Sequence, residues 1–171
     1  VVRAVTSASP IASQALERPI PGGLAWPADG HLDRQTANLL ASAGNSTVVL
    51  VPNAGDPLPT GSAPPQPGIS TYGTPSGSML AIIAEPRITA TLAMPQRTAS
   101  EVLSARQRFL AETGLLAQLS STPVTIVAAP ADVQWAPSRK FAAPALRATS
   151  EAPWIRPATL ESLLASPRSA V

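Results

Sequence analysis

The alternation of apolar and polar positions is most regular between residues 22 and 51, where it predicts a strand, a helix and a second strand. The short apolar run 24–26 is ended by a proline and followed by a turn sequence. Asp33 has the side chain of a helix N-cap, and apolar residues follow at helical spacing until Gly44. Residues 47–51 are then mostly β-branched, which is typical of a strand covered on both faces.

Two later apolar runs, at 79–84 and 123–129, predict further buried strands. The longest predicted helix covers 98–119, where Thr98 and Glu101 stand at the spacing of a capping box and a continuous apolar stripe follows. Predicted strands and helices alternate along the chain. The expected fold class is therefore α/β, with parallel βα units and right-handed crossovers.

The segment 52–78 is dense in Pro, Gly, Ser and Thr and predicts a long loop with one short extended piece at 69–72. Residues 1–16 predict a helix that is interrupted or restarted at Pro10. We expect one domain over 1–171, with a tail at its C-terminus. The segment 88–94 predicts a short helix or a turn, 141–149 and 158–165 predict helices, and 166–171 is the expected tail.

Composition narrows the classes of protein. Hydrophobic residues make up 44% of the chain but aromatic residues only 4%, so the core must be built mainly from Ala, Leu, Val and Ile. The net charge is +2 and the basic residues are scattered, which argues against a nucleic-acid partner. The chain has no cysteine, which excludes disulfides and thiolate metal sites, and no apolar run of about 18 residues.

Three acidic residues lie within three positions after predicted strands, at the strand ends where α/β proteins bind ligands. They are Asp29, Glu85 and Asp132, and tryptophans Trp26 and Trp135 stand beside the first and the last. Carboxylates accept hydrogen bonds from sugar hydroxyls, and indole rings pack against the apolar faces of sugars. The set is therefore a candidate carbohydrate site, and two suitably spaced carboxylates are also what glycoside hydrolysis requires.

A structural role for these residues is the simpler interpretation. An Asp in a Pro-Ala-Asp-Gly turn usually bonds the backbone, and the tryptophans would cover the edge of the core. Binding without catalysis ranks second, and catalysis third. His31 is the only histidine, so this chain cannot by itself build a deacetylase-type site of two His and one Asp; we predict no metal and no cofactor.

The sequence resembles an uncharacterised actinobacterial family of large, exported, membrane-tethered cell-envelope proteins that are often encoded beside the lipid II flippase. The similarity covers most of 24–164, in the same order. Its segments are AWPADGHLDRQTANLLASAG at 25–44, Glu85-Pro86 after a strand, RQRFLAETGLL at 106–116, VTIVAAPADVQWAPS at 124–138 and PWIRPATLESLL at 153–164.

The resemblance implies a divergent barrel, related in outline to polysaccharide deacetylases and barrel-shaped glycosidases, of which this chain would be the C-terminal half. The expected fold is then part of a (β/α) barrel-like domain. The expected location is the extracytoplasmic cell envelope, with the membrane anchor in regions outside this chain. The expected partners are the remainder of the barrel or another protein, a peptidoglycan precursor or other glycan, and a membrane protein.

The leading functional hypothesis is a non-catalytic or degenerate barrel module with a scaffold or glycan-binding role in cell-wall assembly. One alternative is a carbohydrate-active hydrolase or deacetylase whose other catalytic groups lie outside this chain. Another is a structural subunit of a membrane protein complex. An enzyme requires the three acids to converge in one cleft, whereas a binding module requires an exposed tryptophan beside a groove.

Overall fold

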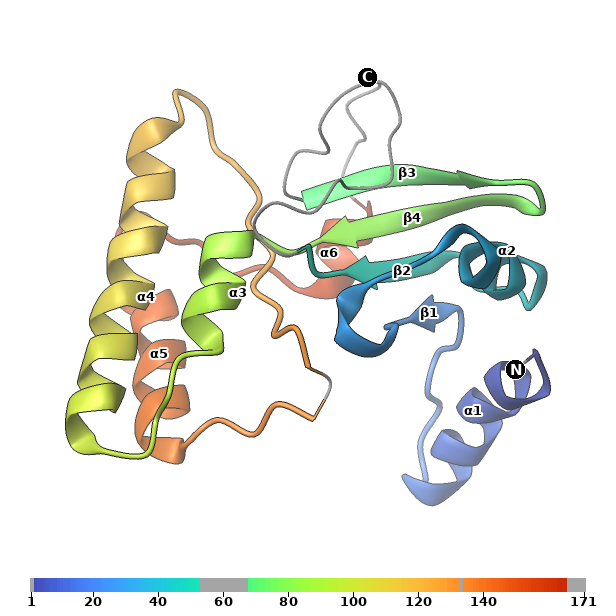
Figure 1. The fold of residues 1–171 in the computed structure, drawn as a ribbon, viewed down its shortest axis with the longest axis horizontal. Helices are drawn as coiled ribbons and strands as arrows, with labels where there is room; N and C mark the ends of the chain where they lie inside the picture. The colour runs from blue at the N-terminus through green and yellow to red at the C-terminus, as the bar shows by residue number, and fades with distance from the viewer. Residues whose placement is uncertain (1, 53–67, 133, 166–171) are drawn as a thin grey trace.

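The structure, a computed structural model, describes residues 2–52, 68–132 and 134–165 of the chain. These residues form a mixed α/β fold with one open, four-stranded sheet in the order β1-β2-β4-β3. β1, β2 and β4 are parallel, and β3 is antiparallel to β4 (Figure 1). The strands are β1 Leu24–Ala25, β2 Thr47–Leu50, β3 Gly68–Thr74 and β4 Gly77–Ile83.

Six α-helices lie in the described ranges, together with the 3-10 turn η1, Ala28–Gly30. Three of them, α3, α4 and α5, gather to one side of the sheet, while α6 lies behind it (Figure 1). Pro10 sits inside α1 without interrupting it, and α5 begins two residues before the predicted start. The helices are α1 Val2–Ala15, α2 Arg34–Ser42, α3 Pro86–Leu92, α4 Ala99–Leu119, α5 Arg139–Glu151 and α6 Leu160–Ala165.

The two central strands are buried on both faces, as the apolar runs predict. Successive side chains of a strand point to opposite faces, so the buried residues of β2 and β4 divide between two clusters. One face packs against α2 through Val48, Leu50, Met79, Ala81, Ile83, Ala37 and Leu40. The opposite face packs against the chain around residue 129 and against α6, through Val49, Val51, Ile82, Ala84, Ala129, Leu163 and Leu164.

A third apolar cluster joins α3, α4 and α5 to one another. Phe109 of α4 and Phe141 of α5 are its aromatic members, and both are buried. Its other buried members are Ile88, Leu92, Val102 and Ala105. The molecule therefore has a sheet core and a separate helical core beside it.

The predicted helix ends of α2 are confirmed. The Asp33 carboxylate accepts a hydrogen bond from the Thr36 backbone N–H at 2.9 Å, which satisfies one of the free donors of the first turn. Gly44 has φ +87, the left-handed conformation that ends a helix at little steric cost in glycine. Hydrogen bonds from the Thr36 side chain and backbone hold the pKa of Asp33 below its ordinary value.

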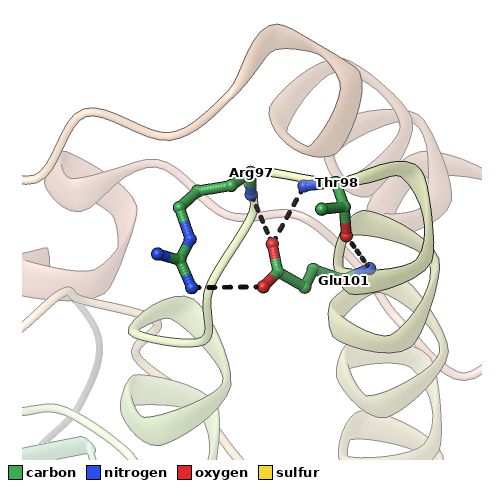
Figure 2. A network of polar contacts seen from close by, with 3 residues as sticks. All are labelled: Arg97, Thr98 and Glu101. Atoms are coloured by element: carbon green, nitrogen blue, oxygen red, sulfur yellow. Dashed lines mark hydrogen bonds and ion pairs between the residues drawn. The ribbon is translucent and has the colours of Figure 1, made fainter.

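The predicted capping box of α4 is also confirmed (Figure 2). The Thr98 hydroxyl accepts from the Glu101 N–H at 3.2 Å, and the Glu101 carboxylate accepts from the Thr98 N–H at 2.9 Å. Glu101 also accepts from the Arg97 N–H at 2.8 Å and pairs with the Arg97 guanidinium at 3.4 Å. The hydrogen bond from Thr98, followed by the contacts with Arg97, holds the pKa of Glu101 below its ordinary value.

The prediction of a loop over 52–78 is wrong from residue 68 onward, where β3 and β4 form a hairpin around the two-residue turn Pro75-Ser76. The extended piece at 69–72 is confirmed, but β3 is longer than that piece. Its polar residues are accommodated because β3 is an edge strand, half exposed and stabilised by backbone pairing with β4. Residues 53–67 of the predicted loop, and the predicted tail at 166–171, lie outside the described residues.

The predicted strand at 123–129 is also wrong. Because β3 already pairs with β4 from Gly77 to Ile83, the free edge of β4 begins only after that point. There the Glu85 N–H donates to the Val127 carbonyl at 2.9 Å. The segment is apolar because Val127 and Ala129 pack on the sheet face, not because it is a member of the sheet.

The sheet is open, so the described residues contain no closed barrel. The coarse expectation of an α/β fold with parallel βα units is confirmed for β1, α2 and β2. Within the ranges that the structure covers, no helix combines the length and the hydropathy needed to cross a bilayer.

Gly30 ends the turn after β1 and contacts Val51 at the end of β2. We predict that any larger residue at this position destabilises the fold. Its φ is +68, and an added Cβ would lie 2.3 Å from the Val51 Cβ and 2.8 Å from the Val51 N. Gly30→Ala should lower the free energy of unfolding by about 1–2 kcal/mol for the left-handed backbone, plus about 1–3 kcal/mol for the overlap.

Gly44→Ala is the matched control for this prediction, since Gly44 has φ +87 but nothing within 4 Å of an added Cβ. Urea unfolding of both variants separates the two contributions. Equal losses of stability in the two variants would show that the contact between Gly30 and Val51 is not tight.

The capping box predicts an acid-dependent stability. A carboxyl whose folded pKa lies below its unfolded value stabilises the fold above the unfolded pKa, and that contribution disappears as the pH falls through the folded value. Glu101→Gln carries no titrating group but keeps an acceptor oxygen. The difference in Tm between wild type and Glu101→Gln should therefore be largest near neutral pH and shrink below the ordinary glutamate pKa. A difference independent of pH would contradict the assignment.

Candidate functional site

Glu85, one of the three candidate ligand-binding acids, caps a helix. It follows β4, is only 6% exposed, and is the N-cap of α3. Its carboxylate accepts from the Ile88 N–H at 2.9 Å, and its own N–H donates to Val127. The end of β4 is therefore closed by α3 and by the segment around Val127, and the carboxylate is committed to the backbone.

Asp132 is exposed, and it too bonds the backbone. Its carboxylate accepts from the Gln134 N–H at 2.7 Å, the contact of an Asx turn. Asp29 lies in η1, but its side chain lies outside the described residues. The convergence of the three acids in one cleft, which an enzyme would require, is therefore not tested, and the described contacts of Glu85 and Asp132 are with backbone N–H groups.

Both predicted tryptophans line pockets. Trp26 is 38% exposed and lies on the wall of a pocket of about 420 Å³ that α1 and α2 share with the chain leading into β1. Trp135 is half-buried on a smaller pocket of about 320 Å³, and its indole N–H donates to the Leu92 carbonyl at 2.9 Å. The cation beside Trp135 is Arg97, which already pairs with Glu101 (Figure 2).

The third tryptophan lines the largest of these pockets, and our sequence analysis did not select it. Trp154 is 46% exposed beside a groove of about 540 Å³ that runs between α4, the segment 120–128 and the end of α5. Most of the lining is apolar and includes Ile88 and Phe109, while five hydroxyl side chains and Arg156 supply its polar groups. The signal available in the sequence was Trp154-Ile155-Arg156, an aromatic and a cation between two prolines.

The pockets of Trp26, Trp135 and Trp154 share two chemical properties. Each has an indole on its wall, and none has Asp or Glu in its lining. Among the described residues, no group of three or more His, Asp or Glu side chains could hold a metal ion. What this arrangement can do chemically is bind an uncharged or anionic ligand through aromatic and hydroxyl contacts.

The fold and these pockets define a small mixed α/β protein with tryptophan-lined pockets. Its sequence matches a family of unknown function (DUF6049) over residues 3–171, nearly the whole chain, and the chain therefore belongs to that family. No curated protein and no solved structure matches it.

Gly114 provides a test of how Trp154 is placed. An added Cβ at this position would meet the Trp154 ring at 3.8–3.9 Å, an ordinary van der Waals distance. Because Gly in a helix interior costs about 0.5–1 kcal/mol relative to Ala, Gly114→Ala should raise the stability by about that amount without displacing the indole. Urea unfolding measures the change. A loss of stability would mean that Trp154 lies closer to α4 than the structure shows.

Proposed function

We propose that this chain is a non-catalytic, glycan-binding module of an extracytoplasmic cell-envelope protein. The observation that carries the proposal is the separation of indoles from carboxylates: the three tryptophans line pockets, whereas Glu85 and Asp132 are bonded to backbone N–H groups. Exposed aromatic rings beside polar groups suit a ligand with both apolar and hydroxyl surfaces. Hydrolysis of a glycoside would instead require paired carboxylates in a cleft.

The location in the envelope, and the relation to a larger barrel, come from the resemblance of the sequence. The open edge of the sheet supports the second part of this proposal. β1 pairs only with β2 among the described strands, and Leu24 is 43% exposed. A preceding strand of a parallel barrel would pair on that free edge, so we propose that the remainder of the barrel joins the sheet beside β1.

The experiment is cosedimentation of the chain with insoluble peptidoglycan, together with assays for released acetate and new reducing ends. We expect the protein in the pellet and neither product in solution. At least one of Trp26→Ala, Trp135→Ala and Trp154→Ala should weaken binding about tenfold, because removing an aromatic ring removes both its contact area and its stacking.

Asp132→Asn is the matched control, since the amide oxygen of asparagine can still accept the Gln134 N–H and Asp132 lines none of the three pockets. Binding by Asp132→Asn should equal that of wild type. Absence of binding would overturn the proposal. Release of acetate or reducing ends that is lost in Asp132→Asn would replace it with the hydrolase or deacetylase alternative.

A further inference from the structure

The groove beside Trp154 differs from the other two tryptophan pockets in size and in charge. Its volume of about 540 Å³ is larger than the 420 Å³ and 320 Å³ of the other two, and Arg156 is the one charged residue in its lining. No acidic residue within the described ranges pairs with Arg156, whereas Arg97 of the Trp135 pocket is paired with Glu101. The Trp26 pocket has no charged residue in its lining.

Contacts with α4 hold Trp154 in place. Its indole N–H donates to the Thr113 hydroxyl at 3.3 Å, and part of the ring lies over Gly114, 3.8–3.9 Å from where a Cβ would stand. Thr113 is itself buried and bonds the Leu110 carbonyl at 3.0 Å. These contacts position the indole without a ligand, and Trp154 as a whole residue is 46% exposed.

Two hydroxyl groups in the lining of the groove, those of Ser120 and Thr149, donate their protons to backbone carbonyls. Ser120 donates its hydroxyl proton to the Leu116 carbonyl at 3.0 Å, and Thr149 donates to the Leu146 carbonyl at 2.7 Å. Because both protons are used within the protein, these two oxygens are left with lone pairs that can accept from hydroxyl or amide donors. Sugars carry such donors around a ring whose faces are apolar.

Arg156 adds the charge that selects among such ligands. A guanidinium binds a carboxylate through two parallel hydrogen bonds, and this pairing is stronger than a neutral hydrogen bond. Trp154 lies two positions before Arg156 in the sequence, and both side chains line the groove. A ring stacked on the indole and a carboxylate attached to that ring would thus engage both residues at once.

We infer that the groove formed by α4, the segment 120–128 and residues 154–156 binds a carboxylated saccharide, with the ring on Trp154 and the carboxylate on Arg156. The inference rests on the proposed glycan binding and deepens it by naming the site and the ligand class. Two kinds of sugar carry the required group, namely one with a carboxyl-bearing ether substituent and one with a uronic acid.

The test is calorimetric titration of the full chain with two acidic oligosaccharides and one neutral disaccharide. N-acetylglucosaminyl-N-acetylmuramic acid carries a lactyl carboxylate, and di-N-acetylchitobiose is its neutral counterpart. A hyaluronan tetrasaccharide supplies the uronate. We expect at least one acidic sugar to bind about tenfold more tightly than the neutral one, and Arg156→Gln to abolish that preference. Which acidic sugar binds identifies the source of the carboxylate.

Arg147→Gln on α5 is the matched control, because it removes the same charge from an exposed position outside the groove lining and should leave the preference intact. Trp154→Phe, which keeps a ring, should bind both sugars more tightly than Trp154→Ala. Equal binding of acidic and neutral sugars, or loss of binding in Trp26→Ala but not Trp154→Ala, would overturn this inference and leave glycan binding standing. Failure of all sugars and of peptidoglycan to bind would overturn both.

Discussion

The parallel pairing of β2 with β4 is the interaction on which the other parts of the structure depend. Both strands are buried on both faces, and their alternating side chains divide the packing between α2 on one side and α6 with the segment around Ala129 on the other. Neither face could be covered by local contacts alone. The two strands come from segments about thirty residues apart, so the fold forms only when distant parts of the chain meet.

The elements that the sequence predicted well are those specified by local chemistry. The Asp33 cap, Gly44 and the capping box of Thr98 with Glu101 each involve residues within a few positions of one another, and all are present. The failures are non-local. β3 exists because it pairs with β4, and the apolar segment at 123–129 is excluded from the sheet because β3 takes that edge.

The candidate site shows the same division between local and distant information. Acidic residues after strands were recognisable by position, but their partners were not: Glu85 bonds the first turn of α3 and Asp132 bonds Gln134. The Trp154 groove has no periodic signal because its lining comes from separate elements, including α3, α4 and α5. Only the arrangement of those helices shows that Trp154 lies over Gly114 with its N–H on Thr113.

The protein's own backbone and helix caps occupy the strand ends, so the groove beside Trp154 and the sheet are built from separate parts of the chain. The carbonyl of Gly30 accepts from the Val51 N–H at the end of β2, and Glu85 lies buried at the end of β4, so backbone and helix caps occupy the places where α/β sheets usually receive ligands. The groove beside Trp154 is lined instead by residues of the helical cluster, Ile88 and Phe109 among them. A substitution at Trp154 or Arg156 would therefore change a groove whose lining contains no strand residue, whereas a side chain at Gly30 would press on Val51 at the end of β2.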